Sequence, residues 1–333
     1  MDSKAKFPVY DVHVHIHPRA SAAFLRVMDG NHIERVVNLG TLEALAIPFE
    51  EGMRVYRETM GERMVYFWTP NFGDVSPGFG ERMADELERR VAAGAAGLKI
   101  FKELGLRHRD AAGNLIPVDD ERLDPLWERA GSVGVPVLIH TADPVAFFQP
   151  LNEANERWEE LRAHPDWYFG GSGLPDHDTL LDQRNRVIER HAGTTFIGAH
   201  LGNYPESLAY VDGCLGRFSN FFVDTSARIG EIGRHPVQAT RAFFLKHADR
   251  VLFGTDQVVG WSPGDDGIGK SPEDFAQVYD AHWRFFETNE VQVEYPGYPI
   301  QGRWKVDALG LPDQVLEQLY YRNARRVIPA LRR

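Results

Sequence analysis

The chain has 333 residues, a net charge of −11, 43% hydrophobic residues and 26% charged residues. This length allows one large domain or two medium ones, and the composition is that of an ordinary globular protein. The negative charge disfavours binding to nucleic acids or anionic membranes, because both need clustered Lys and Arg. We therefore expect a small-molecule ligand.

Cys214 is the only cysteine. An internal disulfide and a thiolate metal cluster are therefore excluded, and any metal site must use His, Asp, Glu or Lys. The first 15 residues lack the apolar run of a signal peptide, and no stretch of about 18 uncharged apolar residues follows. We expect a cytoplasmic protein.

Short apolar segments that end in polar or glycine-containing turns recur along the chain, and we interpret them as strands. They comprise residues 7–15, 33–40, 64–70, 96–101, 135–140, 194–200, 221–226 and 250–256. Several are almost continuously apolar, which is typical of parallel strands that are buried on both faces.

Segments with helical spacing lie between these strands, for example residues 80–94, 124–134 and 311–328. About eight strand–helix units predict a (β/α)8 TIM barrel, and we expect residues 1–333 to form a single domain. Two connections, 141–193 after strand 5 and 257–311 after strand 8, are unusually long. Because both leave the carboxyl end of a strand, we expect them to form walls or lids of a substrate pocket.

The first strand contains the stretch YDVHVHIHP, Tyr10–Pro18. Strict alternation would place Asp11, His13, His15 and His17 on one face and three aliphatic residues on the other. Neighbouring residues on one face are about 6.6 Å apart, whereas His13 and His17 would be about 13 Å apart. One straight strand therefore offers two of these histidines to one metal ion, but not all three.

Other predicted strands end in His140, His200 and Asp256. Each residue alone would more often be structural than functional. Together they place two imidazoles and a carboxylate at the rim that carries His13 and His15, which indicates a common site.

The motifs DVHVH, IH, AHLG and GTD at strands 1, 5, 6 and 8 resemble those of the amidohydrolase superfamily. The phrases AHLGN and FGTD are similar to its amidohydrolase-related branch, which includes aminocarboxymuconate-semialdehyde decarboxylase and lactonases. The resemblance implies a divalent metal ion held by four ligands, which are His13, His15, His140 and Asp256. It also implies that His200 lies beside the metal, where it polarises a carbonyl group or stabilises negative charge.

The ligand types agree with this implication, because imidazoles and a carboxylate suit zinc, with manganese as the alternative. Catalytic zinc keeps an open position and lowers the pKa of a bound water from 15.7 towards about 7. Asp256 would take the proton of that water and later pass it to the leaving group.

Lys99 lies on the fourth predicted strand, where binuclear members of the superfamily carry a carbamylated lysine that bridges two metal ions. His140 and His200 would then hold the second ion. The alternatives are a lysine that contacts an anionic substrate and a lysine that points to solvent. We favour a single ion, with Lys99 as a pocket residue.

Arg228 follows the seventh strand and is a candidate for clamping a substrate carboxylate, with a surface ion pair to Glu231 as the alternative. His17 is placed at the pocket mouth, where it contacts substrate or nothing. The stretch GDDGIGKS, Gly264–Ser271, matches a phosphate-loop pattern. We do not expect a phosphate site, because Pro272 disfavours a helix there and Asp265 and Asp266 would repel phosphate.

Our main hypothesis is a metal-dependent hydrolase that uses activated water to cleave an ester, lactone or amide bond. The alternative is a non-oxidative decarboxylase of an aromatic or unsaturated acid, which would need a cation such as Lys99 or Arg228 to hold the acid group. A third hypothesis is an inactive barrel used for binding. The sequence leaves the substrate and the oligomeric state open, although homodimers are common.

Overall fold

The computed structural model describes residues 4–73, 75–171, 173–260 and 272–332. Within them, parallel strands form one sheet in the order β8-β7-β6-β5-β4-β3-β2-β1-β9. The strands are β1 Val9–Ile16, β2 Ile33–Leu39, β3 Met64–Trp68, β4 Ala95–Ile100, β5 Val137–Ile139, β6 Phe196–Gly198, β7 Phe221–Asp224, β8 Val251–Leu252 and β9 Gln257–Val259.

The sheet closes on itself at the junction of β8, β9 and β1. Strand β8 pairs with β7, and β9, which begins a few residues later, pairs with β1. The segment that connects β8 to β9 also bonds to β1. The Val12 amide donates to the Phe253 carbonyl over 2.9 Å, and the Asp256 amide donates to the His13 carbonyl over 2.8 Å. The predicted TIM barrel is therefore confirmed, with the predicted eighth strand continuing into β9.

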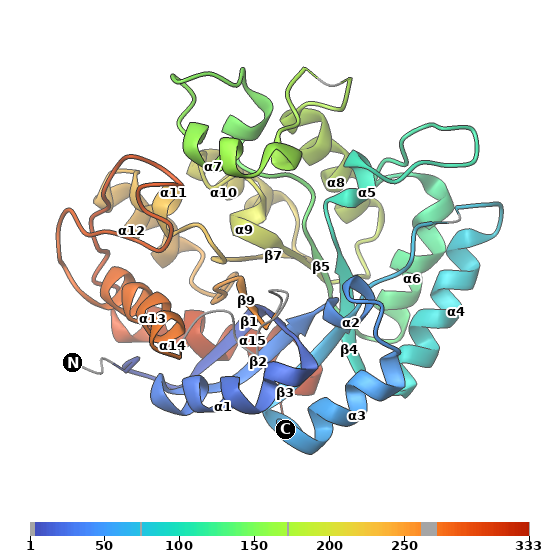
Figure 1. Cartoon of the computed structure of the whole chain (residues 1–333), viewed down its shortest axis with the longest axis horizontal. Helices are drawn as coiled ribbons and strands as arrows, with labels where there is room; N and C mark the ends of the chain where they lie inside the picture. Colours follow the sequence, from blue (N-terminus) through green and yellow to red (C-terminus); the bar gives the residue numbers. More distant parts are fainter. Residues whose placement is uncertain (1–3, 74, 172, 261–271, 333) are drawn as a thin grey trace.

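Helices surround the strands (Figure 1). The longer ones are α1 Ser21–Gly30, α3 Phe49–Thr59, α4 Phe79–Ala92, α6 Asp124–Ser132, α8 His177–Arg190, α10 Leu208–Arg217, α12 Val237–Lys246 and α13 Pro272–Glu287. The shorter ones are α2 Thr41–Ala44, α5 Glu103–Leu106, α7 Trp158–Ala163, α9 Ala199–Gly202, α11 Ile229–Gly233, α14 Asp313–Glu317 and α15 Asn323–Val327. None of the helices in these ranges is long and apolar enough to cross a membrane.

The predicted closing helix, residues 311–328, is α14 and α15 joined by a π-helical turn, Gln318–Arg322. The carbonyl of Leu319 in this turn accepts a hydrogen bond of 3.0 Å from the Phe253 amide, just after β8. The irregular turn thus attaches the last helix to the strand that carries Asp256.

Strand β1 departs from strict alternation. Its pairing with β2 is irregular between Asp11 and Val14. As a result Asp11 accepts a 2.9 Å hydrogen bond from Tyr279 of α13, while Val12 joins an apolar cluster with Leu138 and Leu252. The irregularity separates Asp11 from His13 and His15, with which simple alternation would have grouped it.

The two long connections contain more structure than their sequences suggested. Residues 141–193 include α7, α8 and two 3-10 turns, Val145–Phe148 and Pro165–Trp167, and they pack on an apolar cluster of their own. The second connection contains the 16-residue helix α13, which the sequence pattern did not predict. The phosphate-loop pattern Gly264–Ser271 lies outside the described residues.

Candidate metal centre

Five of the predicted site residues line a cavity of about 800 Å³. His13, His15, Lys99, His140 and Asp256 all contribute to its lining. Its remaining walls come mainly from the segments after β2, β3 and β4, and include Glu43, Ala44, Ala46, Thr69, Pro70, Asn71, Phe72, Phe101, Lys102, Glu103, His108 and Val258. No described residue from 141–193 lines it, so the expectation that this connection forms a wall or lid stays a prediction.

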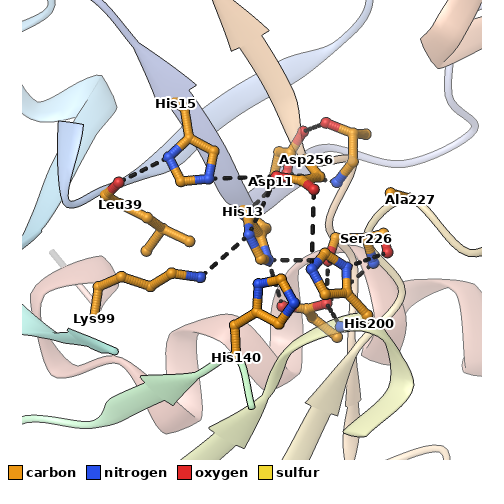
Figure 2. A network of polar contacts seen from close by, with 12 residues as sticks. Asp11, His13, His15, Leu39, Lys99, His140, His200, Ser226, Ala227 and Asp256 are labelled. Carbon is orange, nitrogen blue, oxygen red and sulfur yellow. Dashed lines mark hydrogen bonds and ion pairs between the residues drawn. The ribbon is translucent and has the colours of Figure 1, made fainter. Parts of the chain in front are cut away.

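The two histidines of β1 are buried and held in a defined orientation (Figure 2). His13 Nδ1 lies 2.9 Å from the Asp224 carboxylate, and His15 Nδ1 lies 2.8 Å from the Leu39 carbonyl. Because both partners are acceptors, Nδ1 carries the proton and Nε2 presents its lone pair. These Nε2 atoms lie 3.4 Å (His13) and 3.3 Å (His15) from the same oxygen of Asp256.

His200 is oriented in the same manner. Its Nδ1 lies 2.9 Å from the Ser226 carbonyl, which leaves Nε2 facing Asp256 at 3.9 Å. Burial, followed by the nearby charge of Arg228, holds the pKa of His200 well below its usual value. His200 is therefore a neutral imidazole with its lone pair directed at the centre.

His200 and Asp256 both have left-handed backbone conformations, with φ values of 55° and 61°. Such values are uncommon outside glycine and persist where hydrogen bonds hold them. The His200 amide donates to Asp224 over 2.9 Å, and the Asp256 amide donates to the His13 carbonyl. Strained backbone at both predicted catalytic residues is typical of a functional site.

Asp256 is an ionised carboxylate. Burial acts to raise its pKa, but His13, followed by His15 and His200, holds the pKa well below its usual value. About a quarter of its side chain is exposed, and this part contributes to the cavity lining.

This arrangement fits a cation. Three imidazole lone pairs point at carboxylate oxygens from 3.3 to 3.9 Å, so acceptors face acceptors unless a proton or a metal ion lies between them. The possible ligand atoms of His13, His200 and Asp256 lie within 4.8 Å of one another. The hydrogen bonds at each Nδ1 are those that orient metal-binding histidines.

His140 lies at the edge of this cluster, with its ring centre 4.5 Å from that of His200. Its Nε2 lies 3.2 Å from Asp143, whose other oxygen pairs with Lys102. Burial lowers the pKa of His140 to about 4, so the ring is neutral and able to bind a metal. The structure brings His200 into the tightest group and His140 next to it, and the exact ligand set stays a prediction.

Lys99 points into the centre (Figure 2). It is fully buried, and its Nζ lies 3.5 Å from His13 Nε2. Burial lowers its pKa to about 8, although Asp256 and Asp224 act in the opposite direction. The alternative in which Lys99 points to solvent is therefore wrong.

The other two predicted substrate-binding residues are not among the described residues that line this cavity. Arg228 is buried and donates to the Ala227 carbonyl, and Glu231 pairs with Arg157 instead of forming the surface ion pair considered for Arg228. His17 accepts a 3.1 Å hydrogen bond from the Arg19 amide and so caps the turn Pro18–Ala20. Substrate contact by either residue stays a prediction.

Several residues of the site were not predicted from the sequence. Asp224 and Ser226 orient His13 and His200, Asp143 contacts His140, and Glu43 lines the cavity. The phrase DTS at the end of β7 offered a signal, because it is another acidic strand end at the same rim. Asp143 lies in a loop and Glu43 in the short helix α2, and in neither case does the sequence indicate where the side chain points.

The fold and the site together define a parallel barrel with a candidate metal centre at the carboxyl ends of its strands. The model of the Amidohydrolase family matches residues 68–330, so the chain belongs to this family and the predicted superfamily is confirmed. Members of the superfamily are metal-dependent enzymes. No curated protein matches the chain.

Solved structures of similar fold cover almost the whole chain. A dihydroxybenzoic acid decarboxylase from Polaromonas sp. JS666, with bound manganese and the inhibitor 2-nitroresorcinol, has a TM-score of 0.58 at 16% identity and covers 98% of both chains. A 2,6-dihydroxybenzoate decarboxylase from Rhizobium has a TM-score of 0.56 at 17% identity, covering 96% of this chain and 98% of its own. A putative 2-pyrone-4,6-dicarboxylic acid hydrolase from Pseudomonas putida has a TM-score of 0.52 at 13% identity, covering 97% and 98%. At these identities the likeness establishes the fold alone.

Proposed function

We propose that the protein is a metal-dependent hydrolase that cleaves an ester, lactone or amide bond of a small organic molecule. The observation that carries the proposal is the ionised Asp256 at the cavity surface, faced by the Nε2 atoms of His13, His15 and His200. One divalent ion, zinc or manganese, held by His13, His15, His140 and Asp256 would polarise the scissile carbonyl and make a water molecule more acidic.

The protein residues then have separate tasks. Asp256 accepts the proton of the attacking water and returns it to the leaving group. His200 presents an unprotonated Nε2, because its Nδ1 proton is donated to Ser226. In this form His200 accepts, and does not donate, a hydrogen bond at the substrate.

Lys99 supports an anionic substrate. A buried ammonium group in the cavity lining attracts a carboxylate that enters the cavity. We propose a single metal ion with Lys99 uncarbamylated. Metal analysis of the active protein tests this, because two ions per chain would favour the carbamylated form.

The second candidate is non-oxidative decarboxylation of an aromatic or unsaturated acid. Lys99 favours it, since this reaction needs a cation that holds the acid group. The decarboxylases named among the structures of similar fold support it further.

The test is an assay of the protein loaded with zinc or manganese on two panels of compounds. Acid release from lactones, esters and amides is expected. Carbon dioxide release from aromatic and unsaturated acids, with no activity on the first panel, would replace the hydrolase proposal by the decarboxylase.

A further inference from the structure

A second carboxyl group, Glu43, lines the same cavity as the predicted metal ligands. It belongs to α2, the short helix that follows β2. Tyr66 of β3 donates a 2.6 Å hydrogen bond to Glu43 Oε2, and the same phenol oxygen accepts 2.7 Å from the Leu42 amide. Both hydrogen-bonding functions of Tyr66 are therefore used to fix the carboxyl group in place.

The backbone around Glu43 is held by buried contacts. Thr41 donates to Asn38 Oδ1 over 2.6 Å, and the Ala44 amide donates to the Gly40 carbonyl over 3.1 Å. Leu42 is fully buried. The backbone that carries Glu43 is thus anchored by hydrogen bonds on both sides and by the buried Leu42.

Glu43 has no ion pair within 4 Å among the parts of the chain that the structure describes. Arg90 of α4 acts on it from a distance while paired with Glu50 and Glu86. Burial raises the pKa of Glu43 to about 7. The hydrogen bond from Tyr66, the backbone hydrogen bonds from Glu43 itself and from Thr69, and the charge of Arg90 all act to lower this pKa. At neutral pH a large part of the protein therefore carries a neutral carboxyl group there, which is both a donor and an acceptor.

We propose that Glu43 is a substrate-contacting residue that donates a hydrogen bond to an acceptor oxygen of the substrate, and that Tyr66 is its positioning residue. The substrate class is then a carbonyl compound with a second oxygen acceptor, such as the ring oxygen of a lactone. This inference rests on the proposed hydrolase function. In the hydrolase mechanism proposed above, Asp256 and His200 act at the reacting groups, and Glu43 has no role.

The test compares Glu43→Ala and Glu43→Gln with the zinc-loaded wild type. The probes are the aryl lactone dihydrocoumarin and the most rapidly hydrolysed compound of the lactone and ester panel. Glu43→Ala is expected to raise KM about tenfold, the effect of one lost hydrogen bond, while Glu43→Gln keeps a donor and stays within about threefold. Glu51→Gln, an exposed carboxylate of α3, is the matched control and should leave KM unchanged.

The pH profile separates a substrate contact from a structural role. The donor is the protonated form, so wild-type kcat/KM should fall as the pH rises above about 7, and Glu43→Gln should lack this decline. Tyr66→Phe removes a hydrogen bond that favours the carboxylate, so the decline should move to higher pH.

Two outcomes would overturn the inference while the proposed function stands. Unchanged KM in both Glu43 variants, with the decline still present in Glu43→Gln, excludes substrate contact. Loss of bound zinc or of thermal stability in Glu43→Gln assigns a structural role instead. A wild type that hydrolyses nothing on the panel refutes the proposed function itself, and an active wild type with unaffected variants refutes the inference alone.

Discussion

At the scale of single residues, the histidines of the centre differ in what their Nδ1 atoms contact. His13, His15 and His200 each direct Nδ1 at an acceptor, and each therefore presents an Nε2 lone pair to Asp256. His17 uses its Nδ1 as an acceptor for a backbone amide. Within the stretch Tyr10–Pro18, Nδ1 is therefore protonated in His13 and His15 and unprotonated in His17. This difference leads to two predictions.

His15→Ala is expected to abolish activity and to lower metal content to background, because it removes one of the three lone pairs at Asp256. His17→Ala is expected to keep nearly full metal content, since it removes only the cap of a surface turn. Elemental analysis after dialysis at limiting zinc measures both. Equal metal loss in the two variants would show that the assignment of these histidines is wrong.

Asp224→Asn tests the residues that orient the ligands. Asp224 accepts hydrogen bonds from the His13 ring, the His200 amide and Ser226, so an amide NH2 group in its place would face a donor. We expect zinc affinity to fall about 10- to 100-fold.

Competition with a coloured chelator measures this affinity. Asp212→Asn removes a comparable Asp–His pair at the surface, with His247, and serves as the control. Equal affinity in Asp224→Asn and wild type would mean that His13 needs no orienting carboxylate.

The strand-end residues could be predicted because parallel strands bring their carboxyl ends to one rim regardless of loop structure. His13, His15, His140, His200 and Asp256 all lie there. Glu43 and Asp143 could not be predicted, since their direction depends on the left-handed turn at Gly40 and on contacts such as that between Asp143 and Lys102. The spacing of residues in the sequence reveals neither the turn at Gly40 nor the contact between Asp143 and Lys102.

At the scale of elements, the turn between β2 and α2 shapes the cavity. Gly40 has a φ of 57°, and a Cβ atom there would lie 2.4 Å from Thr69 Oγ1 and 2.6 Å from Phe101 Cε2. Thr69 and Phe101 both line the cavity. The position therefore requires glycine for its conformation and for its space.

Gly40→Ala is expected to destabilise the protein by about 2–4 kcal/mol, because overpacking adds to backbone strain. Gly61→Ala is the matched control. Gly61 has a φ of 55°, and a Cβ atom there would meet nothing within 4 Å, so only strain of about 1 kcal/mol is expected. Urea unfolding followed by tryptophan fluorescence measures both. An equal loss of stability in the two variants would mean that Thr69 and Phe101 move aside without an energetic penalty.

Helix α13 shows where element prediction from sequence failed. It lies inside residues 257–311, which were interpreted as one long connection, although Pro272–Glu287 contains no glycine and one proline, at its first position. Its Tyr279 donates to Asp11 of β1, so the helix that was missed also supplies a buried hydrogen bond to the first strand. The strands were easier to predict, since continuous burial makes their segments apolar throughout.

At the scale of the whole molecule, the barrel is closed by contacts that need no metal. Strand β9 pairs with β1, and the Val12 and Asp256 amides complete the junction. The count of strand–helix units was enough to predict this architecture from sequence. The cavity walls were not predictable, because they come mainly from the segments after β2, β3 and β4, and among the described lining residues Val258 alone belongs to one of the longest connections.

Removal of the metal is therefore expected to leave the barrel folded but less stable. The chelator-treated protein should keep its far-ultraviolet circular dichroism spectrum, because closure and core are independent of the ion. Its Tm should rise when zinc is added, since binding relieves the facing lone pairs of the imidazoles and Asp256. A ligand at 100 times its Kd adds about 2.7 kcal/mol, which corresponds to about 4 °C for a chain of this size. His15→Ala should show no such rise, and a wild-type Tm that is independent of zinc would contradict a metal centre at these residues.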